Sequence, residues 1–439
     1  MRIVSTSPQA PGDIVLDMPS TSPAEVIAVV DRARAAQRAW AATGPAVKSA
    51  ALTAMAAEVA AARDELAALV VREVGKPVTE ARGEVDRAVA ILRYYAQQAY
   101  DPAGETYPAG GGLAFTQRRP RGVAGLITPW NFPLAIPVWK AAPALAFGNA
   151  AVVKPSPDAT ACALRLAELF VPHLPDGLFA VVPGGGDTGV ALVDAIDLVS
   201  FTGSGAVGRQ VAVAAAGRGV PAQCEMGGLS AAIVLPDADL DKAAKEIAYA
   251  AMGFAGQKCT ATKRVIAVGG DVEEALLDAV AALTVGDPTD SAVAVGPVIS
   301  AAARDRVVAA GGSVVDGDGW FVRPTVATGL DATDRLNREE VFGPICTLSA
   351  VPDVRAAIEL SNGTDYGLVT SLYTADLTAA LAFVSECATG MVKVNAPTAG
   401  VDFHLPFGGE RGSGYGGKEQ GKAAAAFYTQ SRTVQVSSL

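Results

Sequence analysis

One short stretch of the chain, residues 254–262, combines a cysteine with polar neighbours and could carry nucleophilic chemistry. It reads Phe-Ala-Gly-Gln-Lys-Cys-Thr-Ala-Thr, so Cys259 has Gln257, Lys258 and Thr260 around it. Burying these polar groups without partners would cost free energy, which favours a position in the wall of a cleft. A nearby cation also favours the thiolate, the form of cysteine that attacks. Cys259 is therefore a candidate nucleophile, although on these residues alone a surface cysteine fits equally well.

The base that such a cysteine needs is more readily found in a glutamate than in a histidine. The chain has only two histidines, His173 and His404, and His173 lies in a Val-Pro-His-Leu-Pro stretch typical of a loop. Glu225 follows a strand-like run and precedes two glycines. A partly buried carboxyl has a raised pKa, which suits a general base. Glu225 is the candidate base, and a surface carboxylate in a turn is the ordinary alternative.

Three further polar residues stand beside expected strands. Asn131 lies in Trp-Asn-Phe at a strand–helix junction, where its amide could donate to a developing oxyanion together with the backbone N–H of Cys259. Lys154 ends an apolar strand, where it could meet a sugar hydroxyl or a phosphate. Glu340 could accept a hydrogen bond from a ribose. Taken singly, each of the three also fits a solvated loop residue.

The elements that would position these residues form an alternating pattern. Between residues 122 and 208 we expect strands separated by helices, at 123–128, 150–154, 178–182 and 198–201. This alternation predicts a parallel sheet with right-handed crossovers, and ligands at the carboxyl ends of its strands. Residues 202–208, Thr-Gly-Ser-Gly-Ala-Val-Gly, open a helix directly after a strand, where small residues let the backbone approach a pyrophosphate. Glycine motifs are permissive, so this stretch alone does not identify a dinucleotide site.

The rest of the chain predicts a second α/β unit over residues 229–400, with strands near 231–235, 264–268, 345–349 and 392–395. Residues 1–22 are rich in Pro and Ser and are expected to be irregular. Ser22 and Pro23 then start the first of several Ala-rich amphipathic helices. The glycine-rich stretch 104–122 is typical of an exposed strand or hairpin that could pair with another element or subunit.

Composition excludes several classes of protein. A chain of 439 residues, half of them hydrophobic, predicts two or three domains of a well-packed α/β enzyme. The net charge of −10 leaves no basic stripe for nucleic acid. Five scattered cysteines indicate a reducing compartment, with neither a disulfide framework nor a zinc site. Without an apolar signal core or a run long enough to span a bilayer, we expect a cytoplasmic enzyme with no metal, nucleic-acid or membrane partner.

Motifs spread along the chain resemble the NAD(P)-dependent aldehyde dehydrogenase superfamily. In the family's order they are Pro129–Pro133, Lys154–Ser156, Phe201–Ser204, Glu225–Gly228, Gly256–Cys259, Glu340–Pro344 and Pro406–Gly409. Glu225 precedes Cys259 by 34 positions, as the family pattern expects. The resemblance covers nearly the whole chain and implies an α/β fold of two parallel-sheet, Rossmann-like domains with a small β oligomerisation element. The implied parts are a cofactor-binding domain (1–103 and 122–227), a catalytic domain (228–410) and oligomerisation strands (104–121 and 427–439).

The resemblance also implies a role for each candidate residue. Cys259 would attack the aldehyde to give a thiohemiacetal whose oxyanion is held by Asn131 and a backbone N–H. After hydride transfer, Glu225 would activate the water that hydrolyses the thioester. Lys140 would support the charge of the site. The expected assembly is a homodimer or a homotetramer acting on a small-molecule aldehyde.

The implied cofactor is NAD or NADP. Lys154 and Glu340 would hold its adenosine and nicotinamide riboses, and Phe342 would lie against the nicotinamide side. The other residues expected in the cofactor cleft are Thr128, Pro129, Trp130, Ser156, Gly203, Ser204 and Gly205. NAD-preferring relatives commonly carry a glutamate three residues after the ribose lysine, and this chain has Pro157 there. We therefore expect NADP to be tolerated.

The substrate is less directly indicated. Residues 136–140, and residues 398–409 followed by Glu419-Gln-Gly, resemble family members that oxidise 2-oxoglutarate semialdehyde. Some semialdehyde enzymes bind the distal carboxylate with an arginine after the Trp-Asn-Phe-Pro helix, but no arginine occurs between Arg121 and Arg165. An aromatic or aliphatic aldehyde therefore remains an alternative substrate. A CoA-acylating relative is a further alternative, and the intact set of candidate residues argues against a non-catalytic binding protein.

Overall fold

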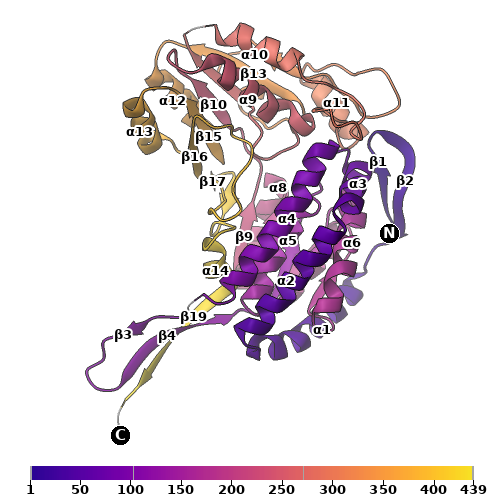
Figure 1. The fold of residues 1–439 in the computed structure, drawn as a ribbon, viewed down its shortest axis with the longest axis vertical. Helices are drawn as coiled ribbons and strands as arrows, with labels where there is room; N and C mark the ends of the chain where they lie inside the picture. The colour runs from indigo at the N-terminus through magenta and orange to yellow at the C-terminus, as the bar shows by residue number, and fades with distance from the viewer. Residues whose placement is uncertain (1, 102, 270, 438–439) are drawn as a thin grey trace.

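The chain folds into two lobes, each built on a parallel β-sheet, with a strand arm that extends away from them (Figure 1). The computed structural model describes residues 2–101, 103–269 and 271–437. The predicted α/β class with two parallel sheets is confirmed. Among the helices in these ranges, none combines the length and the apolar character that crossing a membrane requires.

The sheet of the first lobe has six strands in the order β18-β9-β8-β5-β6-β7, and only β18 runs antiparallel to its neighbour. These strands are β5 (Val123–Ile127), β6 (Ala150–Lys154), β7 (Phe179–Val181), β8 (Leu198–Thr202), β9 (Ala222–Glu225) and β18 (Gly414–Tyr415). Every residue of β5, β6 and β8 is buried, as expected for parallel strands covered on both faces. The helices that alternate with the strands are α5 (Ala135–Ala146), α6 (Thr160–Phe170), α7 (Gly186–Ala195) and α8 (Gly205–Gly217).

Four long helices precede this sheet and complete the core of the first lobe. They are α1 (Pro23–Ala42), α2 (Pro45–Ala61), α3 (Arg63–Val74) and α4 (Val78–Gln98). The predicted start of α1 is present as a capping box, in which the Glu25 amide donates to Ser22 Oγ and the Ser22 amide donates to the Glu25 carboxylate. Helix α4 packs against α2 and α5, while α1 packs against α7 and β6. This packing places one face of α4 beside the elements that carry the candidate site.

The N-terminal segment corrects the expectation of an irregular start. Its strands β1 (Arg2–Ser7) and β2 (Ala10–Pro19) form an antiparallel hairpin. A hydrogen bond to a distant helix holds the hairpin: Ser5 Oγ donates to the buried carboxylate of Glu73 in α3 at 3.0 Å. A local sequence pattern could not predict this contact. Proline and serine are tolerated here because neither strand is paired on its outer edge.

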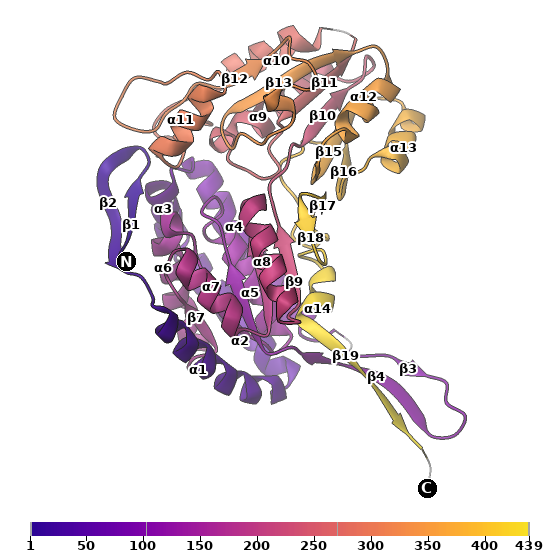
Figure 2. The ribbon, with the colours of Figure 1, turned by 180° about the vertical axis from the view of Figure 1, so that it is seen from behind.

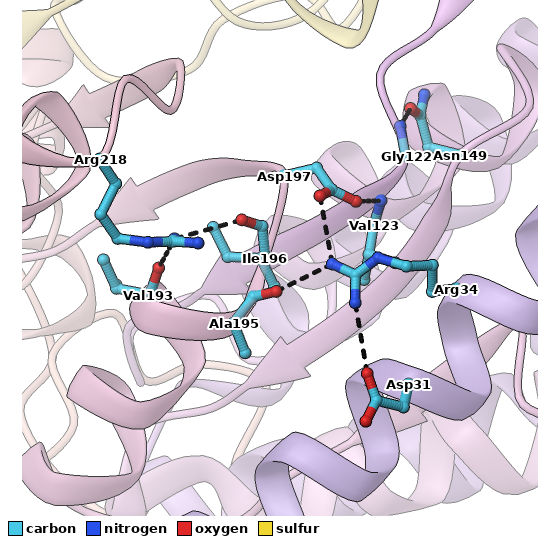
Figure 3. A network of polar contacts seen from close by, with 10 residues as sticks. All are labelled: Asp31, Arg34, Gly122, Val123, Asn149, Val193, Ala195, Ile196, Asp197 and Arg218. Atoms are coloured by element: carbon cyan, nitrogen blue, oxygen red, sulfur yellow. Dashed lines mark hydrogen bonds and ion pairs between the residues drawn. The ribbon is translucent and has the colours of Figure 1, made fainter.

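A polar network fixes where β5 begins (Figure 3). The carboxylate of Asp197, in the turn before β8, accepts from the Val123 amide at 2.8 Å and from Arg34 of α1 at 3.1 Å. Gly122 has φ +137°, and a Cβ there would lie 2.2 Å from the same carboxylate. Asn149 accepts from the Gly122 amide at 3.0 Å and so ties the start of β5 to the turn before β6. The strand whose far end carries the candidate site is therefore anchored at its start.

The sheet of the second lobe has six parallel strands in the order β12-β13-β11-β10-β15-β16. They are β10 (Ala231–Val234), β11 (Arg264–Val268), β12 (Thr325–Ala327), β13 (Ile345–Val351), β15 (Val369–Tyr373) and β16 (Met391–Val394). The helices around them are α9 (Leu240–Met252), α10 (Val272–Ala281), α11 (Ala301–Ala309), α12 (Val354–Asn362) and α13 (Leu377–Glu386). The sequence did not indicate β12 or β15. Strand β15 is buried throughout although it contains Thr370 and Ser371, whose hydroxyl groups have internal hydrogen-bond partners.

Three strands form the arm, in the order β19-β4-β3. They are β3 (Thr106–Tyr107), β4 (Leu113–Pro120) and β19 (Thr429–Val436), and Figure 2 shows them extending well beyond the first lobe. The expected C-terminal strand over 427–439 begins later than predicted, because Phe427 and Tyr428 end helix α14 (Ala423–Tyr428) and are buried in the core. Residues 438 and 439 lie outside the described residues.

Candidate active site

Cys259 lies in a loop between α9 and β11, just after the short 3-10 helix η3 (Gly253–Gly256). Phe254 and Ala255 in this helix have φ of 54° and 51°, a left-handed conformation that costs a non-glycine residue about 1–3 kcal/mol. Both are fully buried, so packing imposes the conformation. At Gly256 a Cβ would lie 2.3 Å from the carbonyl oxygen of Gly343, which makes glycine necessary there. The strained segment immediately before Cys259 fixes the path of the loop.

The Cys259 thiol is neutral at rest. Burial raises its pKa to about 12, and the negative charges of Glu340 and Glu225 act in the same direction. The sequence led us to expect that Lys258 would favour the thiolate, and this expectation is wrong. Its Nζ atom lies 2.7 Å from the Glu80 carboxylate, which balances the cation. Cys259 must therefore lose its proton to a base before it can attack.

Glu225 lies near enough to Cys259 for its charge to act on the thiol, so it remains the candidate base. It is the last residue of β9, and its side chain is buried beneath the loop that carries Gly408 and Gly409. The Gly409 amide donates to Glu225 Oε2 at 3.0 Å. Burial, followed by the negative charge of Glu419, raises the pKa of Glu225 well above its ordinary value. A raised pKa makes the carboxylate a stronger base, which suits general-base catalysis.

Asn131 is fixed against the cysteine loop. Its Nδ2 donates 2.9 Å to the carbonyl oxygen of Gln257, two residues before Cys259. The Gln257 side chain is itself held, since it donates to the carbonyl oxygen of Pro297 at 3.2 Å and accepts from the Ile299 amide at 2.8 Å. An amide nitrogen carries two hydrogens, so one remains for a substrate oxygen. The structure thus brings Asn131, Glu225 and Cys259 to one region between the lobes.

Lys140 is buried on α5, away from any direct contact with Cys259. Its ammonium group donates to Ser200 Oγ at 2.7 Å and forms an ion pair with Glu419. The positive charge of Lys140 lowers the pKa of Glu225, while Glu419 raises it. Glu419 is therefore part of the site's electrostatics, a role that sequence reasoning missed. The signal for it in the sequence was the Glu419-Gln-Gly stretch, which resembles semialdehyde-oxidising family members but did not indicate an electrostatic role.

The residues expected to hold the cofactor lie at the carboxyl ends of β5, β6 and β8. Thr128 directly follows β5, and Thr202 is the last residue of β8. The Oγ1 atoms of both threonines are buried without a hydrogen-bond partner among the described residues. Ser204 is the N-cap of α8, which begins at Gly205, but its side chain makes no capping hydrogen bond. The first amides of this helix are thus available to a phosphate. These orphaned groups fit a dinucleotide.

The strand end at β6 offers a separate subsite. Lys154 ends the strand, and burial lowers its pKa to about 8. Its Nζ donates 2.9 Å to the carbonyl oxygen of the next residue, Pro155. Ser156 follows and caps the short helix η1 (Pro157–Ala159), accepting from the Asp158 amide at 3.4 Å. The backbone at Gly203 passes close to Phe201, where a Cβ would lie 2.6 Å from the ring.

The nicotinamide side of the expected cleft is formed from both lobes. The ring of Trp130, which follows Pro129, meets the ring of Phe342 edge to face, with 5.7 Å between centroids. Glu340 Oε1 accepts from the Gly228 amide at 3.2 Å, and burial raises the pKa of Glu340 to about 7. These contacts bring Trp130, Phe342 and Glu340 to the region that the sequence assigned to the cofactor.

A cavity of about 260 Å³ opens beside Cys259. Its wall includes Trp139 and Phe407, whose rings lie 5.7 Å apart, and Gln420. Helix α4 supplies three charged lining residues, Glu80, Glu84 and Arg87. Sequence reasoning missed them, because the Ala-rich stripes of these helices were taken as core. Their spacing of four and three positions places them on one helical face, which was the available signal.

Comparison with known proteins agrees with this geometry. The sequence model described as "Aldehyde dehydrogenase family" matches residues 1–434. The chain is 39% identical to the alpha-ketoglutaric semialdehyde dehydrogenase of Bacillus subtilis (strain 168) over 85% of its length and 82% of that protein. It is 38% identical to the alpha-ketoglutarate semialdehyde dehydrogenase of Haloferax volcanii over 98% of its length and 94% of that protein.

Solved structures give the same result. The NAD-dependent aldehyde dehydrogenase from Sinorhizobium meliloti superposes with a TM-score of 0.95 at 33% identity, covering 100% of this chain and 92% of that one. The match of the family over nearly all residues, the relatives and the shared fold lead to one conclusion. The chain belongs to the aldehyde dehydrogenase family and oxidises an aldehyde with NAD or NADP.

Proposed function

We propose that the physiological substrate is 2-oxoglutarate semialdehyde and that the product is 2-oxoglutarate. The observation that carries the proposal is the cavity beside Cys259, which is walled by charged and polar side chains of α4 as well as by aromatic rings. Such a wall suits a short, polar aldehyde better than an aliphatic chain or a benzene ring. Two relatives that are 38–39% identical bear the name of this semialdehyde's dehydrogenase, which supports the same choice.

In the proposed mechanism Glu225 takes the proton of the Cys259 thiol, directly or through a water molecule. The thiolate attacks the aldehyde carbon, and the oxygen that becomes negative accepts hydrogen bonds from Asn131 Nδ2–H and from the Cys259 backbone N–H. NAD(P), when bound, accepts the hydride that leaves this carbon. The fixed position of Asn131 against the Gln257 carbonyl means that little reorganisation is needed at this step.

The second half of the proposed reaction releases the acid. Glu225 first releases to solvent the proton that it took from Cys259. It then takes a proton from water as that water attacks the thioester, the Cys259 thiolate leaves, and the proton on Glu225 returns to the sulfur. Each oxidation thus consumes one water molecule and returns the cysteine. A buried carboxyl with a raised pKa, whose charge acts on Cys259, supports hydrolysis over transfer of the acyl group to CoA.

The experiment is an absorbance assay of reduced nicotinamide formation on the purified protein. The aldehydes are 2-oxoglutarate semialdehyde, succinic semialdehyde, benzaldehyde and hexanal, each with NAD and with NADP, with and without CoA. We expect the highest kcat/KM for 2-oxoglutarate semialdehyde and no dependence on CoA. A higher kcat/KM for benzaldehyde or hexanal would overturn the proposed substrate assignment. A rate that requires CoA would overturn the proposed hydrolytic step.

We also infer a homodimer or homotetramer located in the cytoplasm. The support for assembly is the arm of β3, β4 and β19, which extends from the first lobe with exposed apolar side chains such as Leu113 and Val436. The support for location is that all five cysteines are free, as a reducing compartment favours.

A further inference from the structure

We propose that Arg87, with Trp139 and Gln420, binds the acid end of the substrate and so selects a 2-oxo acid semialdehyde. This inference rests on the proposed function and assigns that selectivity to side chains. All three residues line the same cavity as Cys259. The recognised chemistry is a carboxylate and the keto oxygen beside it, at the end of the molecule opposite the aldehyde.

The Arg87 guanidinium has N–H groups that are free to donate hydrogen bonds to a ligand. A guanidinium carries five N–H donors, and among the described residues Arg87 makes one hydrogen bond, from Nη1 to the carbonyl oxygen of Val401 at 2.7 Å. It forms no ion pair with any described carboxylate within 4.0 Å. Burial lowers the pKa of Arg87, but arginine remains charged in proteins. The cavity wall thus holds a partly buried cation with no carboxylate of the described residues in direct contact.

The two carboxylates on the same helical face are already balanced. Glu80 pairs with Lys258 at 2.7 Å. Glu84 pairs with Lys76, and its other oxygen accepts from the Leu134 and Ala135 amides at 2.9 Å each. Arg87 is thus the charged lining residue of α4 that has no carboxylate in direct contact among the described residues, and the charges of Glu84 and Asp402 act on it from a distance. A substrate carboxylate would supply the missing anion through charge-assisted hydrogen bonds.

Two more groups in this wall lack partners. Trp139 Nε1 and both amide atoms of Gln420 are buried without a hydrogen-bond partner among the described residues. Gln420 is only 2% exposed and has φ +60°, so its strained backbone is fixed by its surroundings. An apolar aldehyde would leave these groups unpaired, which is costly in a buried site. The oxygen atoms of a 2-oxo acid can accept from Trp139 Nε1 and from Gln420 Nε2.

The position of Arg87 offers a substitute for the arginine that this chain lacks after the Trp-Asn-Phe-Pro motif. Semialdehyde enzymes that use an arginine after the Trp-Asn-Phe-Pro helix would place it near Trp139 on α5, where this chain has none. Helices α4 and α5 pack against each other, and residues of both line the cavity. The guanidinium therefore reaches the same space from the neighbouring helix.

The test compares Arg87→Met with wild type on 2-oxoglutarate semialdehyde and on pentanal, which has five carbons but no acid group. We expect the substitution to lower kcat/KM for the semialdehyde about 10- to 100-fold, mainly through KM, as loss of a charge-assisted hydrogen bond predicts. Pentanal oxidation should be unchanged or faster. Arg87→Lys should restore part of the semialdehyde activity. Arg82→Met is the matched control, because Arg82 lies on the same helix but is exposed and pairs with Asp64.

A direct binding measurement separates this inference from the proposed function. Calorimetric titration with 2-oxoglutarate should show binding to wild type and to Arg82→Met, and at least tenfold weaker binding to Arg87→Met. Failure of wild type to oxidise the semialdehyde while it still binds 2-oxoglutarate through Arg87 would overturn the proposed function only. Equal losses on pentanal and the semialdehyde in Arg87→Met, or 2-oxoglutarate binding that does not depend on Arg87, would overturn the inference. Gln420→Met should weaken 2-oxoglutarate binding without affecting pentanal, which tests the second donor independently.

Discussion

At the residue scale, the active site keeps its nucleophile protonated until a base acts. The Cys259 thiol has a pKa of about 12 because it is buried near two carboxylates, and its neighbouring lysine is paired elsewhere. A neutral thiol is a poor nucleophile and is also less prone to oxidation. In the proposed mechanism the reactivity of Cys259 depends on Glu225, whose own pKa is held high by burial and by Glu419.

We predict that Glu225→Gln slows both halves of the reaction. The amide cannot take a proton from the Cys259 thiol or from water, so thiol attack and thioester hydrolysis should both slow. Rapid mixing should show no burst of reduced cofactor, and the steady-state rate should lie about 100- to 10,000-fold below wild type, the usual contribution of a general base. Cys259→Ala is the control and should bind the cofactor but reduce none of it. A steady-state rate in Glu225→Gln equal to that of wild type would contradict the role.

A second prediction concerns pH. Glu225 must be ionised to accept a proton, so kcat/KM should fall as pH falls through its raised pKa, above the ordinary value of 4.5 for glutamate. In Glu419→Gln the negative charge that raises the pKa of Glu225 is removed, and Lys140, which lowers it, loses its partner. Both changes move the acidic limb to lower pH. A pH–rate profile with the limb unmoved or shifted upward would disprove the coupling.

Individual residues show what sequence reasoning could and could not reach. Cys259, Glu225 and Asn131 were identified because their side-chain types suit nucleophile, base and oxyanion donor and because they stand in recognisable motifs. The pairing of Lys258 with Glu80 was not predictable, since the two are 178 positions apart and meet only through tertiary packing. Arg87 was overlooked for the same reason.

At the element scale, strand ends determine where the cofactor can bind. Strands β5, β6 and β8 were predictable from their apolar runs, while β15 and the β1–β2 hairpin were not. Their polar residues form hydrogen bonds with partners that are distant in the sequence, as Ser5 does with Glu73. A local sequence pattern cannot predict such contacts. The short helix η1 after β6 is also important for the expected cofactor site, because we predict that its first residue determines which ribose substituent is tolerated.

We predict that Pro157→Glu converts the enzyme to NAD preference. Pro157 begins η1, three residues after Lys154, and a carboxylate there can accept from a ribose 2′-hydroxyl but repels a 2′-phosphate. Wild type should bind NAD and NADP with comparable Kd values by fluorescence titration. The variant should lose at least tenfold in NADP affinity and keep its affinity for NAD. Pro175→Glu, which adds the same charge in an exposed turn, should change neither Kd, and exclusive NAD binding by wild type would contradict the reasoning.

At the scale of the whole molecule, the arm is difficult to explain in an isolated chain. Leu113 and Phe115 lie on one face of β4, because alternate residues of a strand share a face. Their partners in β19 are Val436 and Val434, which extend the same face. Leu113 is 50% exposed and Val436 is 53% exposed. An apolar face on a projecting sheet is expected to be covered, and a second copy of this chain is the proposed cover.

We therefore predict that charge on this face dissociates the assembly. The double variant Leu113→Glu/Val436→Glu places two carboxylates opposite each other on the apolar face, so it should elute as a smaller species than wild type in size-exclusion chromatography with light scattering. Thr433→Glu is the control, because Thr433 is exposed on β19 and points to the other face, one position from Val434. It should retain the wild-type mass. Cys259, Glu225 and Asn131 all lie within one chain, away from the arm, so the dissociated species should still reduce the cofactor when an aldehyde is supplied. A monomeric wild type, or a double variant of unchanged mass, would show that the arm does not hold subunits together.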